Sequence, residues 1–114
     1  MKTEKKIQSF KKLEKGWLFG EGISFDESII DKAIILNREV LKHGFKTNAF
    51  PGIKGEIQIT VYFLNHYFEF IIEPDMNITF VYEIDDKEID YQENLSFESA
   101  KNKINKLKEY IHNY

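Results

Sequence analysis

Three stretches between Glu56 and Ile84 alternate apolar and polar residues, and this alternation constrains the fold more than any other feature of the sequence. A period of two places successive side chains on opposite faces of a β-strand. The apolar members are Ile57, Ile59, Val61 and Phe63, then Phe68, Phe70 and Ile72, then Ile78, Phe80, Tyr82 and Ile84. Because only short polar segments separate the stretches, the sequence predicts consecutive antiparallel strands joined by tight turns.

The turns between these stretches determine which residues pair across the predicted sheet. Tight turns are expected at Asn65-His66, at Pro74-Asp75-Met76 and at Asp86-Lys87, the last leading into a short fourth strand. The resulting pairs are Phe63 with Phe68, Ile72 with Ile78, and Tyr82 with Tyr91. The second turn requires a positive φ at Met76, which methionine adopts poorly, so a longer loop with Asn77 in the left-handed conformation is the alternative.

Helices are expected before and after the strands, where apolar residues recur at spacings of three and four. The first spans Thr3–Lys15, the second begins at Ser24 and ends at Gly44, and the third begins at Ser96. Ser24 and Glu27 have the spacing of a capping box, and glycine suits the left-handed residue that ends a helix. The expected fold is α+β, with two N-terminal helices, an antiparallel three- to four-stranded meander and a C-terminal helix, the helices packing on one sheet face.

Size and composition predict a single α+β domain over residues 1–114. The chain has no cysteine, which fits the reducing cytoplasm and excludes thiol chemistry, thiolate metal sites and disulfides. No apolar run approaches the roughly 18 residues that cross a bilayer, and the polar segment Met1–Lys6 does not resemble a secretion signal. We therefore expect a cytoplasmic protein that does not associate with a membrane.

Charge is unevenly distributed along the chain, although the formal net charge is only −3. Acidic residues predominate from Glu56 to Glu98, where Lys87 is the one lysine, whereas both ends of the chain are rich in lysine. The basic ends can fold back beside the acidic middle, or the middle can present an acidic surface to a basic partner. The acidic middle also argues against nucleic acid as the partner, because it would repel phosphate.

No residue pattern in the sequence indicates a catalytic or metal site. His43, His66 and His112 lack the spacing of zinc ligands, and each is expected to be solvent-exposed. The acidic run Asp85–Asp90 lacks the glycine and the final glutamate of a calcium-binding loop. The glycine-rich segment Gly16–Gly22 lacks the lysine and hydroxyl residue of a phosphate-binding loop. We therefore expect a protein that has no cofactor and is not an enzyme.

The second face of the predicted sheet is mixed, with tyrosines and aliphatic residues among carboxylates. The registers given above place Tyr62 in one row with Glu69 and Val81, and they also place Asp90 and Gln92 on this face. Apolar anchors with charge at the rim are typical of a protein-binding patch, whereas an ordinary solvent-exposed or helix-covered face is the alternative. The candidate partner-binding residues are Tyr62, Tyr67, Glu69, Ile71, Glu73, Val81, Glu83 and Asp85.

Several short motifs resemble those of a group of small, largely uncharacterised bacterial proteins. Those proteins have a Gly-Trp-Asp-Gly-type loop, a Pro-Ile-Ser helix start, a Gly-Gly-Ile-Gln strand and a Pro-Asp-Gly hairpin. The corresponding segments here are Gly16–Gly20, Ile23-Ser24, Gly55–Gln58 and Pro74–Met76. This chain lacks the aspartate after the tryptophan and has methionine in place of the hairpin glycine. The resemblance supports the expected α+β fold and implies a bacterial or phage origin. It implies no activity.

The segment Leu95–Ala100 is also similar to the helix opening of HicB-type antitoxins, in which hairpin strands lead into a helix. The charge layout, the mixed face and the lack of a catalytic set lead us to expect a non-catalytic interaction module of the antitoxin, immunity-protein or inhibitor kind. Its acidic sheet face would bind a basic protein, and a homodimer is compatible with this hypothesis. The rival hypothesis is a small enzyme or ligand-binding protein with a pocket at Trp17 and Phe19.

Overall fold

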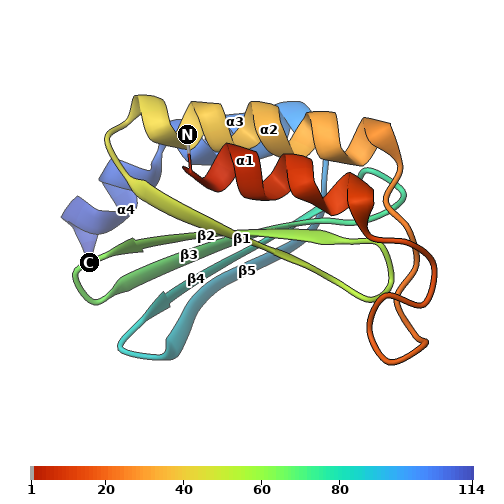
Figure 1. Ribbon diagram of the computed structural model, residues 1–114. Helices are drawn as coiled ribbons and strands as arrows, with labels where there is room; N and C mark the ends of the chain where they lie inside the picture. Colours follow the sequence, from red (N-terminus) through yellow and green to blue (C-terminus); the bar gives the residue numbers. More distant parts are fainter. Residues whose placement is uncertain (1) are drawn as a thin grey trace.

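The computed structural model describes residues 2–114 and arranges them in two layers, a five-stranded antiparallel sheet and a layer of helices on one of its faces (Figure 1). The α+β class and the antiparallel meander are therefore confirmed, but the expected three to four strands are five. In chain order the elements are α1 (Lys2–Ser9), the 3-10 helix η1 (Phe10–Lys12), α2 (Glu27–Lys42), β1 (Lys46–Pro51), β2 (Ile57–Phe63), β3 (His66–Ile72), β4 (Ile78–Ile84), β5 (Lys87–Leu95), α3 (Phe97–Asn105) and α4 (Leu107–Asn113).

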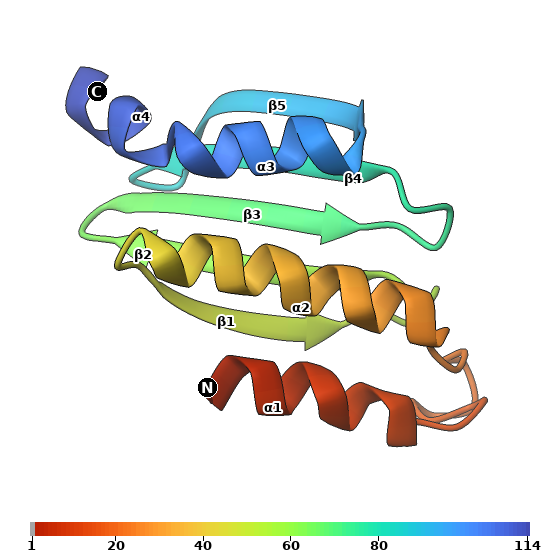
Figure 2. The same ribbon diagram turned by 90° about the horizontal axis from the view of Figure 1, so that it is seen from above.

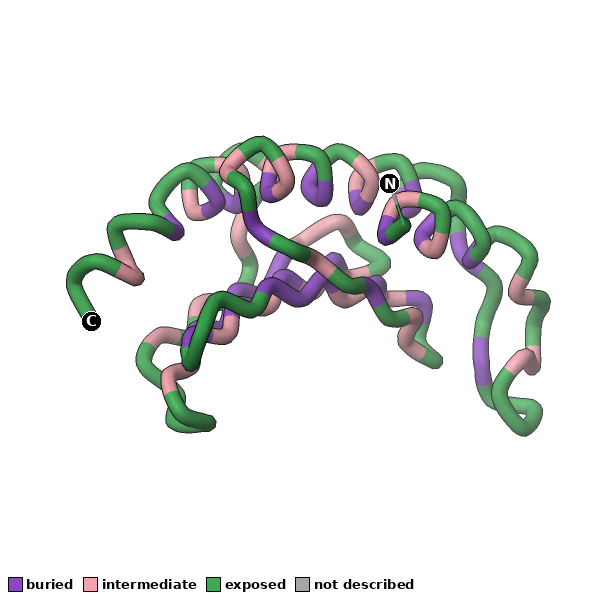
Figure 3. The backbone as a smooth tube through the Cα atoms, turned by 60° about the vertical axis from the view of Figure 1, so that its left-hand side comes forward, coloured by how far each residue is buried: buried purple, intermediate pink, exposed green. Residues whose placement is uncertain are grey.

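The helices divide the sheet between them. Helix α2 packs over β1, β2 and β3, whereas α3 packs over β4 and β5 (Figure 2). Helix α1 lies beside α2 along the free edge of β1. The buried residues lie between the two layers (Figure 3), as expected when an amphipathic helix covers the apolar face of a sheet. The largest fully buried side chains are Tyr82, Phe68, Phe70 and Phe80.

The first predicted hairpin has the right faces but the wrong register. Its turn is at Leu64-Asn65, so that Phe63 lies opposite His66 and Val61 lies opposite Phe68. The prediction placed the turn one residue later and thereby shifted the pairing by two residues. A shift of two leaves every side chain on its original face, so the apolar pattern alone cannot distinguish the two registers.

The second hairpin is as predicted, with Ile72 opposite Ile78. Met76 has a φ of 73° and therefore occupies the left-handed position that the short turn requires, which excludes the longer alternative loop. The third hairpin differs from the prediction, because its turn is at Asp85-Asp86 and Ile84 lies opposite Lys87. A register irregularity between Tyr82 and Glu83 then brings Tyr91 opposite Val81 rather than opposite Tyr82, and a second one follows between Ile78 and Phe80.

Strand β1 was not expected, and its composition explains why. Its inward-facing residues are Thr47, Ala49 and Pro51, which lie opposite Val61, Ile59 and Ile57 of β2. Two of the three are small or polar, so the alternation carries little apolar signal. Proline is tolerated because it is the last residue of a strand at the sheet edge.

The ends of the N-terminal helices also differ from the sequence prediction. Helix α1 ends at Ser9, and the 3-10 turn that follows brings the Phe10 ring to 5.8 Å from the ring of Phe25. Helix α2 begins at Glu27 rather than Ser24, since its N-cap is Asp26 in an extended conformation and Phe25 before it is buried in the core. The proposed capping box is therefore wrong.

The C-terminal helical region starts as predicted and then breaks. The Ser96 hydroxyl accepts a hydrogen bond from the Ser99 N–H and caps α3. At Lys106 the expected single helix divides into α3 and α4. The break lets Tyr110 pack on Tyr82, with ring centroids 5.2 Å apart. Within residues 2–114, no helix combines the length and apolar character needed to cross a membrane.

Candidate protein-binding face

The sheet surface that faces away from the helices is left bare by them (Figure 1), and we call it the outer face. Alternation along the strands gives this face three cross-strand rows. The first row holds Phe50, Gln58, Ile71 and Thr79, the second holds Asn48, Thr60, Glu69, Val81 and Tyr91, and the third holds Lys46, Tyr62, Tyr67, Glu83 and Glu88.

These rows correct the ones predicted from the sequence. The shifted first hairpin brings Tyr62 beside Tyr67 and Glu83, not beside Glu69 and Val81. In β5 the residues beyond the irregularity between Tyr82 and Glu83 change face, because a one-residue slip turns the side chains that follow it over. The outer face therefore carries Tyr91 where Asp90 and Gln92 were expected.

Exposure varies sharply across the outer face. Tyr62 is 64% exposed and Tyr91 is 48% exposed, so both aromatic rings are available for contact. Thr60 and Val81 are only 3% and 7% exposed, although no helix covers them. Neighbouring side chains on the same face must shield them. Val81 therefore offers a partner little surface and packs beneath the exposed side chains of the outer face.

Two carboxylates and two tyrosines lie together in the second and third rows. The rings of Tyr62 and Tyr67 have centroids 4.8 Å apart, and the Tyr67 hydroxyl donates to Glu69 Oε1 over 3.0 Å. Burial raises the pKa of Glu69, and the negative charge of Glu83 raises it further against the opposing effect of the Tyr67 hydrogen bond. Burial and the neighbouring Glu69 likewise raise the pKa of Tyr67.

The remaining predicted site residues lie around this group. Ile71 is half-buried in the first row, and Glu73 follows the last residue of β3. Burial and the carboxylates of Glu56 and Asp75 raise the pKa of Glu73. Asp85 lies in the turn between β4 and β5, where its carboxylate accepts a hydrogen bond from the Asn65 side chain over 3.2 Å.

A small hollow opens at the first row, with a volume of about 130 Å³. Its walls include Phe50, Gln58 and Ile71, which all belong to the outer face. Phe50 is 42% exposed. The hollow could receive one apolar side chain of a partner, as the anchor pockets of protein interfaces do.

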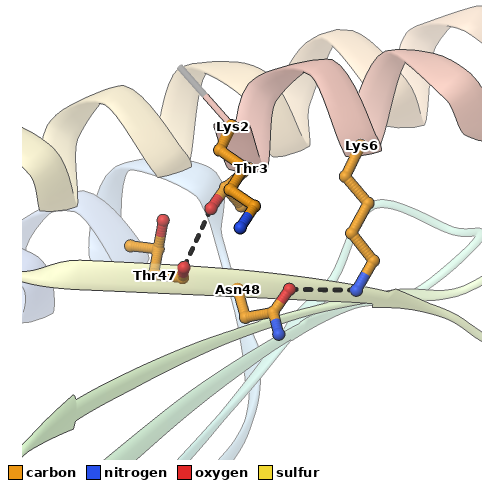
Figure 4. A pocket seen from close by; sticks show the side chains of 5 residues that line it. All are labelled: Lys2, Thr3, Lys6, Thr47 and Asn48. Atoms are coloured by element: carbon orange, nitrogen blue, oxygen red, sulfur yellow. Dashed lines mark hydrogen bonds between the residues drawn. The ribbon is translucent and has the colours of Figure 1, made fainter.

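A larger hollow, of about 380 Å³, lies between α1 and β1. Figure 4 shows Lys2 and Lys6 reaching down from the helix towards Thr47 and Asn48 of the strand. The Thr3 hydroxyl donates to the Thr47 carbonyl over 2.8 Å, and Lys6 Nζ donates to Asn48 Oδ1 over 2.9 Å (Figure 4). These contacts cover the edge of β1, which would otherwise be free to pair with another strand.

A third hollow, of about 360 Å³, is mainly apolar and lies between the end of α2, the end of β2 and α4. Phe45, Phe63 and Ile111 line it together with two histidines, His43 and His112. The His43 ring is 3.0 Å from Asn105 Oδ1, and no carboxylate lines this hollow. Its chemistry suits an apolar group rather than a metal ion.

The loop around Trp17, where the rival hypothesis places its pocket, closes on the indole ring. The Trp17 indole N–H donates to the Ile23 carbonyl over 2.7 Å, and the ring packs 6.1 Å from Phe25. A Cβ on Gly22 would lie 2.3 Å from the indole nitrogen, so the loop closes tightly on the ring. Phe19 is 97% exposed, and Trp17 lines none of the three hollows described above.

His66 also departs from expectation, because it is buried rather than solvent-exposed. It is 7% exposed, and its Nδ1 is 2.7 Å from the Tyr82 hydroxyl. Its ring stacks on that of Tyr82 with centroids 5.9 Å apart. Within residues 2–114, no three acidic or histidine side chains are grouped closely enough to hold a metal ion.

Sequence reasoning missed two parts of the outer face. Tyr91, whose hydroxyl donates to Glu93 over 2.7 Å, was not predicted on the outer face because the predicted register of β5 was wrong. The outward residues Lys46, Asn48 and Phe50 were not predicted there because β1 was not expected. Only the exposed aromatic Phe50, close to the alternating stretch, could have signalled this strand.

In comparisons with known protein families, curated proteins and solved structures, no match to this chain was found.

Proposed function

We propose that the protein is a non-catalytic binding module that docks a basic partner protein on its outer face. The single observation that carries the proposal is the composition of this uncovered face, with exposed tyrosines beside half-buried carboxylates. Tyrosine is enriched in protein interfaces because it offers a large, rigid contact area together with a polar end. We expect Tyr62, Tyr67 and Ile71 to act as anchors.

Charge supports a basic partner in particular. Glu69, Glu73 and Glu83 lie on or beside the outer face, and β5 adds Glu88. None of these carboxylates forms an ion pair within the described chain, where the recorded pairs involve other residues. An acidic surface of this kind accelerates association with a basic surface and disfavours acidic partners. Antitoxins, immunity proteins and inhibitors of basic toxins or nucleases are the protein classes that fit this description.

The proposal is tested first by isolating the partner. The tagged protein and its double variant Tyr62→Ala/Glu69→Gln are used for affinity purification from the source organism, with Ile35→Ala as a matched control. Ile35 is 39% exposed on α2, on the opposite layer. Any protein that is captured by the wild type and by the control, but not by the double variant, is then purified and titrated.

The titration decides between the outcomes. We expect the double variant to weaken binding by at least tenfold, because truncated interface anchors typically cost about 1.4 kcal/mol or more. Affinity should also fall as salt is raised, while Ile35→Ala should leave it unchanged. If a folded double variant binds the purified partner as tightly as the wild type does, the outer face is not the docking surface.

A further inference from the structure

The third row of the outer face places aromatic and acidic side chains in direct register. Tyr67 lies opposite Tyr62 on one side and opposite Glu83 on the other. Glu69 follows two residues after Tyr67 on the same strand face and accepts a 3.0 Å hydrogen bond from the Tyr67 hydroxyl. Glu69 and Glu83 are therefore diagonal neighbours, which in antiparallel sheets lie about 7–8 Å apart.

These two carboxylates carry uncompensated charge. Neither is paired with a lysine or arginine within residues 2–114. Glu69 is half-buried, and the proximity of Glu83 raises the pKa of Glu69 further above its usual value. Lys46 of β1 is the nearest base in the row, and Tyr62 stands between it and Tyr67. A cation arriving from outside would remove the repulsion between the two carboxylates.

A second observation in the adjoining row points the same way. Thr60 lies directly opposite Glu69 and is 3% exposed, yet its hydroxyl has no hydrogen-bond partner in the described chain. Unpaired buried hydroxyls are uncommon because burial without a partner is costly. The outer face therefore presents, side by side, two carboxylates without a cation and one hydroxyl without a partner.

We propose that Tyr62, Tyr67, Glu69 and Glu83 form a recognition site for an arginine side chain of the partner protein. The inference rests on the proposed function and specifies the chemistry of that contact. The guanidinium plane would stack on the Tyr62 ring, which is the most exposed aromatic ring in the row. Its N–H groups would bond to the Glu69 and Glu83 carboxylates, and the Thr60 hydroxyl would become a further acceptor once the side chains that shield it move apart.

Arginine fits this site better than lysine for two reasons. Its planar fork offers five donors and can serve two separated carboxylates at once, whereas an ammonium acts as a point charge. A guanidinium is also less strongly hydrated and stacks on aromatic faces, so it enters a half-buried site at lower cost. The site should therefore discriminate between two side chains of equal charge.

The test uses two small ligands of equal charge, N-acetyl-arginine amide and N-acetyl-lysine amide. Backbone amide shifts of the ¹⁵N-labelled protein are followed during titration. We expect saturable shifts centred on Tyr62, Tyr67, Glu69 and Glu83, with roughly fivefold or greater preference for the arginine ligand. The variant Glu69→Gln/Glu83→Gln should lose these shifts, whereas Glu14→Gln/Glu109→Gln, with the same change of charge at exposed helix and loop positions, should retain them.

Each other outcome overturns the arginine site. Equal binding of the two ligands, shifts scattered over the surface, or shifts unchanged in Glu69→Gln/Glu83→Gln would all contradict it. The spectrum of each variant reports its folding, and Tyr62→Ala tests the stacking contact without altering charge. If the arginine ligand fails but the purified partner still requires Tyr62 and Glu69, only the arginine site is wrong. If substitution of Tyr62 and Glu69 leaves binding of the partner unchanged, the proposed function is wrong, regardless of the result of the ligand titration.

Discussion

The buried pair of His66 and Tyr82 allows a direct test of the strand register. The Tyr82 hydroxyl lies 2.7 Å from His66 Nδ1, and a longer contact of 3.4 Å joins it to the Tyr110 carbonyl. His66 is 7% exposed and Tyr82 is fully buried, so water cannot easily replace the Tyr82 hydroxyl as a hydrogen-bond partner of His66. If His66 lay in the turn, as the sequence suggested, this contact would not form.

The variant Tyr82→Phe removes only the hydroxyl. The ring still stacks on Phe68, with centroids 4.5 Å apart and planes 10° from parallel. The loss is therefore one short hydrogen bond and the orphaning of a buried imidazole nitrogen, a combination that costs about 1–3 kcal/mol. For a chain of 114 residues this corresponds to a fall in Tm of roughly 4–13 °C.

Urea unfolding followed by circular dichroism measures the free energy of unfolding of this variant and of a matched control. Tyr91→Phe also removes a tyrosine hydroxyl, whose hydrogen bond to Glu93 is 2.7 Å long, but Tyr91 is 48% exposed. Water can replace that bond, so we expect a change within about 0.5 kcal/mol. Equal losses in the two variants, or no loss in Tyr82→Phe, would refute the buried pair.

Three further predictions concern the loop, the outer face and the helix caps. Gly22→Ala should destabilise the fold more than Gly44→Ala and red-shift the fluorescence of the single tryptophan, because the new Cβ would lie 2.3 Å from Trp17 Nε1. A Cβ on Gly44 meets nothing within 4 Å and adds only backbone strain. An unshifted spectrum of Gly22→Ala would contradict the packing of Trp17. Burial raises the pKa of Glu69 above its ordinary value of 4.5, so the folded state holds this proton more tightly than the unfolded state does, and stability should fall as pH rises from 4.5 through the raised pKa. Glu69→Gln should flatten that part of the stability profile measured by urea unfolding, and a profile identical to the wild type would count against the desolvated carboxylate. Ser96→Ala should cost about 1 kcal/mol by removing a helix cap, whereas Asp26→Ala should cost less because its side chain makes no cap hydrogen bond; equal losses on thermal unfolding would contradict this difference.

The strands with large apolar residues were predictable from sequence, and the reason is physical. In β2, β3 and β4 every inward position needs a side chain large enough to fill the space beneath α2 and α3, so alternation is unambiguous. The same requirement predicted a loop that keeps Ile72 opposite Ile78, whereas the choice of Met76 over Asn77 for the left-handed position is visible only in the structure. The burial of a sheet face thus outweighed the poor fit of methionine to a positive φ.

The details that sequence could not give depend on contacts between distant residues. The register of the first hairpin was ambiguous by two residues, and the position of His66 beside Tyr82 resolves it. The face of Tyr91 depends on irregular pairing between β4 and β5, for which the sequence carries no periodic signal. Six of the eight candidate site residues belong to β2, β3 or β4, so their placement on the outer face needed only the correct alternation.

Photo-crosslinking to the purified partner tests the central claim most directly. A photoreactive phenylalanine analogue is placed at Tyr62, on the outer face, and in a separate variant at Ile35, on the exposed side of α2. We predict a crosslinked product from position 62, diminished by high salt and mapping to a basic segment of the partner, and none from position 35. Crosslinking from position 35 alone would place the partner on the helices and contradict the account.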